Sequence, residues 1–234
     1  VHALVFGLPP GQGFRHSEDF RTVFGADEVL HVLEGTMIIA DPENGEVQRV
    51  EAGQQVSFGR DTWHHAFAHG ERPLRVLELF APPPAAGASS AYAKTRPFLQ
   101  ESRYADDDRL GAWPGGEPLR PRLRVIRAPD VLWRRDLGVL AGVLLSTPQL
   151  TVHTLELGPG EAALPHRHGG DELLFALEGP LWVRVWHEGA VSVFELEAED
   201  ACFIPEGADH EYRNAGGGMA RALAGVAPRY AAGS

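Results

Sequence analysis

Short runs of apolar residues follow one another along the whole chain. The 27 glycines and 18 prolines interrupt the runs rich in Val, Leu, Ile and Phe before they reach helical length, and helical periodicity is scarce. Many short strands joined by turns are typical of a β-sandwich or a β-barrel. The pattern therefore predicts an all-β fold.

The two halves of the chain repeat one pattern. The segment DEVLHVLEG from Asp27 matches DELLFALEG from Asp171 at an offset of 144 positions, with Glu second and Gly last in both. Upstream, Gly11 aligns with Gly160, and the first half holds five extra residues between this glycine and the shared Glu. Such an internal repeat indicates a tandem duplication in which each half forms one barrel.

Composition predicts where the two halves begin and end. Residues 81–97 are rich in Ala, Pro and Ser, and residues 104–122 form a second irregular connection with a run of aspartates. The second half has a lead-in from about Leu123 that the first half lacks, which indicates that an N-terminal strand is trimmed or supplied from elsewhere. We expect an N-terminal barrel over residues 1–100, a linker over 101–122 and a C-terminal barrel over 123–234.

Charge and composition exclude several classes of partner. The chain carries 21 Lys and Arg against 32 Asp and Glu, a formal net charge of -11, which repels nucleic acid and anionic membranes. No apolar run approaches the roughly 20 residues that cross a bilayer. The single cysteine, Cys202, excludes an internal disulfide. We expect a cytoplasmic protein, although the chain opens on Val1 rather than Met and its true start stays open.

The second half contains a constellation of metal-binding side chains. In GEAALPHRHGGDELLFALEG, His166 and His168 are two residues apart, so on a strand both point to the same face. Glu172 follows on the next strand, and His210 lies in PEGADHEYRN, where a turn leads into a further strand. Imidazole and carboxylate ligands suit Mn, Fe, Co, Ni, Cu or Zn and leave coordination positions open for water, O₂ or a substrate oxygen. We predict one divalent transition metal ion per chain, with Fe or Mn favoured.

These residues resemble the two sequence motifs of the cupin superfamily. The first motif, G-x5-HxH-x3,4-E-x6-G, is matched at every position from Gly160 to Gly179. The second, G-x5-PxG-x2-H-x3-N, is matched except at its first glycine, where Glu199 stands. The resemblance covers both halves and implies a bicupin, with two jelly-roll barrels in tandem. Homodimers are common among cupins, so the resemblance also implies a homodimer.

The first half has lost most of this metal motif. Thr22 and Phe24 stand at the two histidine positions, whereas Glu28 and His64 remain. Because a hydroxyl and a phenyl ring do not replace two imidazoles, we expect no metal in this barrel. Glu28 and His64 would then form hydrogen bonds with each other or with water. His16 lies in the insertion and remains an alternative ligand.

Two further side chains are candidates for catalytic roles. His153 shares the inward parity of the leucines in TVHTLEL and aligns with Leu4, so a polar group appears in the half that keeps its ligands. It is either an acid–base or hydrogen-bonding group beside the metal, or a core histidine. Tyr212 shares the parity of His210 and either lines the cavity or packs in the core with its hydroxyl at the rim.

The strand PLWVRVWHE is apolar on both faces. Its tryptophans, Trp182 and Trp186, lie on the face opposite to its leucine and valines. A sheet that is exposed on one side alternates with polar residues instead. We therefore expect both faces to be covered, one by the barrel interior and the other by the second barrel or a partner subunit.

A cupin fold does not by itself select a reaction. The leading hypothesis is a metal-dependent dioxygenase acting on a small cyclic or aromatic compound, similar to gentisate- and quercetin-type dioxygenases. The alternatives are a non-redox hydrolase, isomerase or decarboxylase, and a non-enzymatic small-molecule-binding cupin. Oxalate decarboxylase is disfavoured because both of its barrels usually hold metal, and no cluster of Arg or Lys marks an anionic substrate. Candidate apolar walls for an aromatic guest are Leu155, Leu157, Leu174 and Phe203.

Overall fold

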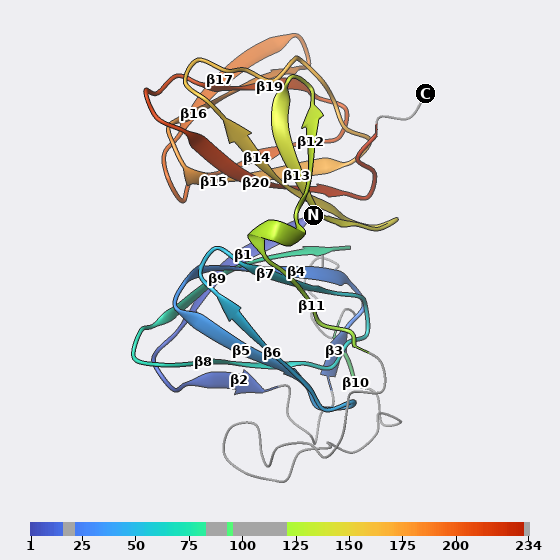
Figure 1. Ribbon diagram of the computed structural model, residues 1–234. Helices are drawn as coiled ribbons and strands as arrows, with labels where there is room; N and C mark the ends of the chain where they lie inside the picture. Colours follow the sequence, from blue (N-terminus) through green and yellow to red (C-terminus); the bar gives the residue numbers. More distant parts are fainter. Residues whose placement is uncertain (16–21, 83–92, 96–120, 232–234) are drawn as a thin grey trace. The chain divides into compact units, whose positions relative to one another are not determined.

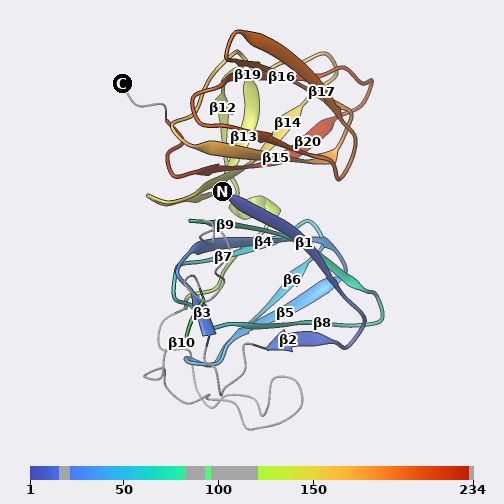
Figure 2. The same cartoon turned by 180° about the vertical axis from the view of Figure 1, so that it is seen from behind.

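The computed structural model describes residues 1–15, 22–82, 93–95 and 121–231. The chain divides into two compact units, residues 2–129 and 130–234, and each is a β-barrel (Figures 1 and 2). The single helical element of the described part is the 3-10 turn η1 (Ala128–Asp130). No helix in this part is long and apolar enough to span a membrane. The predicted all-β fold of two tandem jelly-roll barrels is confirmed.

The N-terminal unit is built from two main sheets and a short strand pair, all with antiparallel neighbours. The apolar residues of the two main sheets meet in a single core that includes Leu30, Met37 and Val76. The first sheet has the order β1 (His2–Leu8), β9 (Leu74–Ala81), β4 (Asp27–Glu34), β7 (Gln55–Phe58), β11 (Arg124–Ile126). The second has the order β2 (Gly13–Arg15), β8 (His65–Ala68), β5 (Thr36–Asp41), β6 (Glu46–Glu51), and the pair is β3 (Thr22–Phe24) with β10 (Ala93–Thr95).

The C-terminal unit repeats this arrangement with two sheets around its own core, which includes Leu174, Leu181 and Tyr212. The six-stranded sheet has the order β12 (Leu132–Asp136), β13 (Val139–Ser146), β14 (Thr151–Leu157), β20 (Ala220–Ala227), β15 (Asp171–Glu178), β18 (Ala201–Ile204). The three-stranded sheet has the order β17 (Ala190–Leu196), β16 (Leu181–His187), β19 (Asp209–Asn214).

Strand register confirms that the two barrels are copies of one unit. Glu28 of β4 lies opposite Phe58 and Phe80, as Glu172 of β15 lies opposite Ile204 and Val226. The ladder of each central strand also shifts at the same place, between Val32 and Glu34 in β4 and between Ala176 and Glu178 in β15. A β-bulge at matching positions is a feature that duplicated strands share.

The boundary between the barrels differs from the expected one. Arg124–Ile126 form β11, which pairs with β7 of the N-terminal unit, so the C-terminal unit begins near residue 130 and not at Leu123. The physical reason is burial, because Leu123 packs into the N-terminal core and Ile126 is 1% exposed. β11 extends the first sheet of the N-terminal barrel next to β7. In the C-terminal barrel, β12 and β13 lie at the other edge of the sheet, next to β14. β11 is therefore not the counterpart of β12 or β13. The expected linker lies outside the described residues except for its last two positions.

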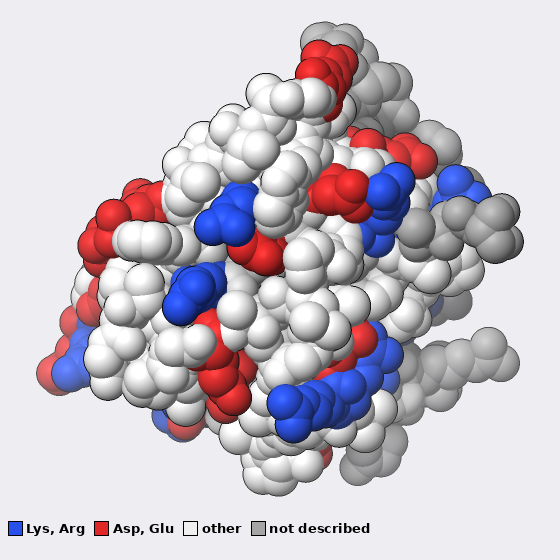
Figure 3. All heavy atoms as spheres, turned by 90° about the horizontal axis from the view of Figure 1, so that it is seen from above, with Lys and Arg blue, Asp and Glu red and all other residues white. Residues whose placement is uncertain are grey.

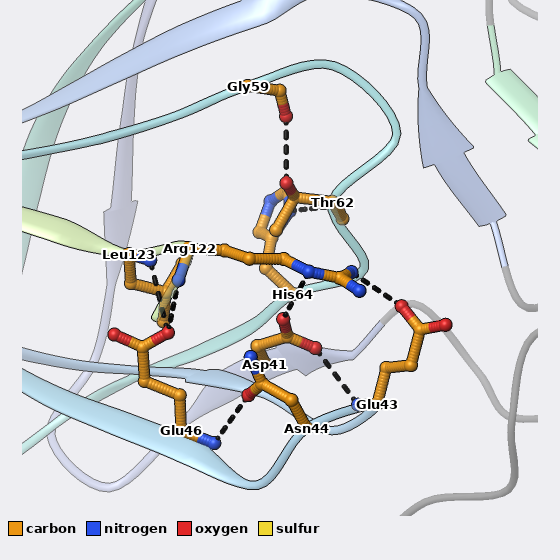
Figure 4. A network of polar contacts seen from close by, with 9 residues as sticks. All are labelled: Asp41, Glu43, Asn44, Glu46, Gly59, Thr62, His64, Arg122 and Leu123. Carbon is orange, nitrogen blue, oxygen red and sulfur yellow. Dashed lines mark hydrogen bonds and ion pairs between the residues drawn. The ribbon is translucent and has the colours of Figure 1, made fainter. Parts of the chain in front are cut away.

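A polar network fixes the chain where it enters β11 (Figure 4). The carboxylate of Glu46 accepts hydrogen bonds from the backbone nitrogens of Arg122 and Leu123, at 2.6 and 3.1 Å. The guanidinium of Arg122 lies 2.5 Å from the carboxylate of Glu43 and 3.6 Å from that of buried Asp41. Burial raises the pKa of Asp41 to about 6, although the charge of Arg122 opposes this shift. These contacts hold residues 122–126 on the N-terminal barrel.

Surface charges of opposite sign lie next to one another. One face of the molecule is largely uncharged and carries small neighbouring groups of basic and acidic side chains (Figure 3). In the C-terminal unit, for example, Arg221 pairs with Glu156 and Glu178 at 3.1 and 3.0 Å. Exposed pairs of this kind contribute little to stability.

The strand β16 is apolar on both faces, as expected, but only one face is covered. Leu181, Val183 and Val185 are buried in the core. Trp182 stays 42% exposed, and Trp186 is half-buried with the guanidinium of Arg184 5.6 Å from its ring centre. The described residues of the C-terminal unit therefore leave the outer face of β16 open.

Candidate metal centre

The structure brings together the four predicted metal ligands. One ligand atom from each of His166, His168, Glu172 and His210 lies within 4.8 Å of the others. His166 and His210 face each other across an antiparallel bridge, with backbone hydrogen bonds of 2.9 and 2.8 Å. Glu172 is the second residue of β15, and the backbone nitrogen of Gly207 donates to the carbonyl of His168 at 3.1 Å. The turn of the second motif therefore holds the first motif in place.

The hydrogen bonds of the three histidines orient their rings for metal binding. Each Nδ1 lies against a backbone carbonyl oxygen, at 2.7 Å for His166, 2.7 Å for His168 and 3.0 Å for His210. A carbonyl oxygen only accepts, so each Nδ1 carries the hydrogen and donates it. The Nε2 lone pairs then point to the centre of the site, which is the arrangement common in metal-binding histidines.

The electrostatics of the site favour a cation at its centre. The Oε2 atom of Glu172 lies 2.9 Å from Nε2 of His210 and 3.5 Å from Nε2 of His168. Because the Nδ1 atoms of these histidines carry the hydrogens, their Nε2 atoms are acceptors. Each of these close pairs therefore places an acceptor nitrogen next to an acceptor oxygen. Oε2 of Glu172 and Nε2 of His166 are also buried without a hydrogen-bond partner. A bound divalent cation satisfies all of these atoms at once, so the residues fit the predicted metal.

The pKa shifts of the four ligands arise from their burial and from their charges on one another. Burial raises the pKa of Glu172, but the close approach of His210, with that of His168 and the Tyr212 hydroxyl, outweighs burial and brings it to about 2. Burial lowers the pKa of His210, but the Glu172 carboxylate reverses this shift and raises it. Burial lowers the pKa of His166 to about 4 and also lowers that of His168. Both of these histidines are therefore neutral near pH 7, the form that binds metals.

Tyr212 lies inside the site and not at its rim. Its hydroxyl donates to Oε1 of Glu172 at 2.5 Å and lies 3.0 Å from Nε2 of His210, and the residue is 2% exposed. Burial, followed by the charge of Glu172, raises its pKa well above the usual value, so the hydroxyl stays protonated. Tyr212 therefore packs in the core, as one alternative expected, but its hydroxyl lies within the site instead of at the rim. A catalytic role for Tyr212 stays a prediction.

His153 is buried beside the site on β14. It is 3% exposed, its Nδ1 has no hydrogen-bond partner, and its ring meets Tyr230 edge-on at 5.3 Å between centroids. Burial lowers its pKa to about 4, although the charge of Glu172 opposes the shift. A neutral imidazole with an unpartnered nitrogen is not a satisfied core histidine, because buried polar groups are normally paired. Its catalytic role also stays a prediction.

Sequence reasoning missed a group of residues that supports His168. The carbonyl of Tyr230 accepts the Nδ1 hydrogen of His168, and the Tyr230 hydroxyl donates to Asp136 at 2.7 Å. Arg134 in turn pairs with Asp136 at 2.8 Å. Neither motif includes these residues. The available signal was a difference between the repeats, because Tyr230 stands where the first half has Pro84 in the otherwise similar segments APRYAAG and APPPAAG.

Of the four apolar residues expected to line the cavity, three are buried and one is exposed. Leu155, Leu157 and Leu174 are buried in the C-terminal core. Phe203 is 55% exposed, so the prediction that it lines the cavity is wrong. On β18 its neighbours Cys202 and Ile204 are buried, and alternation along the strand turns Phe203 outward.

In the N-terminal barrel, each of the two remaining motif residues contacts another group of the same barrel. Glu28 forms a side-chain hydrogen bond with Glu78, and burial and the charge of Glu78 raise its pKa well above the usual value. His64 donates from Nδ1 to the carbonyl of Thr62 at 3.2 Å, and its ring centre lies 4.6 Å from that of Phe58. Within the described ranges, the C-terminal cluster is the one group with metal-binding geometry. The position of the alternative ligand, residue 16, lies outside those ranges.

Comparison with known proteins supports the duplicated architecture. A family model described as "Cupin domain" matches residues 5–80 and 153–226. Oxalate decarboxylase of Lactobacillus farciminis in complex with formate has 16% identity and a TM-score of 0.69, covering 98% of this chain and 77% of that one. Oxalate decarboxylase of Bacillus subtilis at pH 4.6 has 18% identity and a TM-score of 0.69, covering 98% and 68%.

A further Bacillus subtilis oxalate decarboxylase structure, from work on its Mn(II) centres, has 16% identity and a TM-score of 0.70, covering 98% of this chain and 69% of that one. No curated protein matches the chain by sequence. At these identities the solved structures show the fold. The two matched segments of the family model lie one in each barrel, and the chain therefore belongs to the cupin family, as a bicupin with its intact metal motif in the second barrel.

Proposed function

We propose that this bicupin is a metal-dependent enzyme that acts on a small carboxylic acid without net oxidation, most simply as a decarboxylase. The observation that carries this proposal is the burial of the site. His168, Glu172 and His210 are at most 5% exposed, and His166 is the one ligand that is half-buried. An enclosed site of this kind favours a substrate of few atoms over a bulky aromatic ring system.

The solved structures give a second line of support. Those named above are oxalate decarboxylases, one of them in complex with formate and another from work on Mn(II) centres. Their identity to this chain is 16–18%, so they support the class of reaction only as an analogy. The exposure of Phe203 also removes one of the apolar walls on which an aromatic guest depended.

Each residue of the site has a role in this proposal. The three histidines and Glu172 would hold a divalent ion, which would supply a Lewis acid for a carboxylate oxygen of the substrate. Tyr212 holds Glu172 through the bond to Oε1 and keeps the other oxygen directed at the centre. Decarboxylation releases CO₂ and leaves a carbon that needs one proton. The neutral ring of His153 accepts a proton from the substrate acid and returns it to that carbon.

Turnover of short dicarboxylic and 2-oxo acids by protein loaded with Mn(II), assayed under argon, tests this proposal. We expect CO₂ release that depends on metal, and a loss of at least about 100-fold in rate in His153→Ala, the size of a general acid–base contribution. His187→Ala is the matched control, because His187 is a half-exposed histidine on β16. Tight binding of such acids without any turnover would instead indicate a non-enzymatic binding protein.

The second candidate is a dioxygenase with Fe(II) or Mn(II). The ligand set supports it, because three imidazoles and one carboxylate leave open positions on a redox-active metal. The test is O₂ consumption by Fe(II)-loaded protein with catechols, gentisates and flavonols. Uptake of O₂ with one of these, and no CO₂ release from small acids under argon, would replace the decarboxylase proposal by this one.

A further inference from the structure

The chain that follows β20 lies directly on the metal-binding loop. We name residues 228–231 the C-terminal strap. A Cβ atom on Gly169 would lie 2.5 Å from the carbonyl oxygen of Ala231, and one on Gly170 would overlap the carbonyl of Ala227. Only glycine permits such an approach of two backbones. The glycine pair next to His168 therefore serves contact with the strap as well as the turn itself.

Tyr230 holds the strap against His168 in two ways. Its carbonyl oxygen accepts the Nδ1 hydrogen of His168 at 2.7 Å, and its ring lies 4.5 Å from the His168 ring between centroids. The side chain is itself fixed at its far end. Its hydroxyl donates to Asp136 of β12 at 2.7 Å, and Arg134 pairs with Asp136 and lies 5.6 Å from the Tyr230 ring centre.

The duplication provides an internal comparison. The segment APRYAAG from Ala227 corresponds to APPPAAG from Ala81, so Pro84 stands at the position of Tyr230. The half that keeps His168 has the tyrosine, and the half with Phe24 at that ligand position does not. The tyrosine that contacts His168 is therefore present in the half that has this histidine and absent from the half that lacks it. This difference between the two repeats comes from their sequences alone. It therefore supports a link between Tyr230 and His168 independently of the contacts in the structure.

We infer that Tyr230 is a positioning residue of the metal centre, through which the C-terminal strap fixes the ring of His168. The carbonyl selects the tautomer with its lone pair on Nε2, and the packed ring restricts rotation. The anchor on Asp136 keeps the carbonyl in place. Outer partners of this kind typically account for 10- to 100-fold in metal affinity. The inference rests on the proposed metal site but not on the reaction.

Three variants of the full chain test the inference. Tyr230→Ala removes the ring and its anchor, Tyr230→Phe removes only the bond to Asp136, and Gly169→Ala displaces the strap without touching any side chain of the site. Metal-free protein is titrated with Mn(II) by calorimetry, and the Co(II) form is followed by its visible absorption spectrum. We expect Tyr230→Ala and Gly169→Ala to weaken Mn(II) binding about 10- to 100-fold, and Tyr230→Phe to weaken it less.

Matched controls separate positioning from general damage. Gly217→Ala places its methyl group in open space, and Asp200→Asn alters a carboxylate that caps a turn elsewhere. Both should bind Mn(II) like the original chain, and melting temperatures identify any variant that fails to fold. If Tyr230→Ala misfolds, Tyr230→Phe and Gly169→Ala decide the question. A changed Co(II) spectrum in these variants, absent in the controls, supports positioning.

The outcomes also distinguish this inference from the proposed function. Unchanged Mn(II) affinity and an unchanged Co(II) spectrum in folded Tyr230→Ala and Gly169→Ala would overturn the inference alone. Weakened binding in these variants without turnover of any small acid supports the inference while the proposed reaction fails. An original chain that binds no divalent metal would overturn both.

Discussion

The hydroxyl of Tyr212 donates a hydrogen bond of 2.5 Å to Oε1 of Glu172, and both residues are fully enclosed in the second barrel. This bond occupies one carboxylate oxygen, so Glu172 presents only Oε2 to the three histidines. A carboxylate held in this way binds a metal through one oxygen and leaves room for a further ligand. Tyr212 thereby links the core of the barrel to the geometry of the site.

Tyr212→Phe should weaken metal binding without unfolding the barrel. The phenyl ring fills the same space, but Glu172 loses its partner and is free to rotate or to bind through both oxygens. We expect a loss of about 10-fold or more in Mn(II) affinity, measured by calorimetry, as for other partners of metal ligands. The control is Asp200→Asn, which alters a carboxylate that caps a turn outside the site. Equal affinity in Tyr212→Phe and the original chain would contradict this role.

The double variant His166→Ala, His168→Ala should abolish metal binding, because the remaining two ligands do not complete a site. In the original chain we expect one metal ion per chain, since Thr22 and Phe24 stand at the two histidine positions of the first barrel. Elemental analysis after dialysis measures both quantities. Two ions per chain, or undiminished metal in the double variant, would show that the first barrel holds a metal. Glu28→Gln should leave the metal content unchanged.

The buried pair of Glu28 and Glu78 should make the N-terminal barrel less stable as pH rises. Burial raises the pKa of both groups, so the folded barrel keeps protons that the unfolded chain has already released. The resulting stability is complete below the unfolded pKa of about 4.3 and is lost as the pH rises through the folded pKa values. Glu28→Gln removes this loss, and we expect a gain of about 1 kcal/mol at pH 8 and little change at pH 4.

Thermal unfolding between pH 4 and pH 8 measures this effect, and a gain of that size shifts the melting temperature by roughly 4–8 °C for a domain near 100 residues. Glu71→Gln is the control, because Glu71 is exposed on the same barrel. A difference between Glu28→Gln and the original chain that is the same at every pH would mean that ionisation is not the cause.

The sequence predicted the parts of the site that lie within short motifs. His166, His168 and Glu172 are found from spacing along one segment, because alternation on strands and a turn fix their directions. The partners of His168 escaped prediction because they are remote, with 62 positions between His168 and Tyr230 and 94 between Tyr230 and Asp136. No local pattern relates such positions, and only the folded barrel brings them together.

Two errors of the sequence analysis have simple physical reasons. From its sequence, the segment LRVI could belong to either barrel. The pairing of its strand with β7 and the burial of Leu123 in the N-terminal core assign it to the first barrel. Phe203 was taken for a cavity wall because it is large and apolar. The alternation of β18 decides otherwise, since Cys202 is 7% exposed and Phe203 55%.

The outer face of β16 and β17 should mediate self-association. Trp182 is 42% exposed, and Val191 and Val193 on the neighbouring edge strand are each 57% exposed. By strand pairing, Val47 of β6 in the first barrel matches Val193, and Arg49, which pairs with Glu51 at 3.0 Å, matches Glu195. Charged residues on an edge strand oppose pairing with another chain, and residues 191–194 of β17 form a run without a charge.

We therefore propose that two copies associate through β17 and that Val193→Arg, which places a charge within this edge strand, converts a dimer to a monomer. Sedimentation velocity over a range of concentrations measures the state. The matched control is Leu132→Arg, which places the same charge at an exposed leucine on a different sheet, 68% exposed on β12. A monomeric original chain would contradict the proposal outright. A dimer that survives Val193→Arg but dissociates in Leu132→Arg would move the interface to the opposite sheet, where Leu132 and Trp133 are exposed.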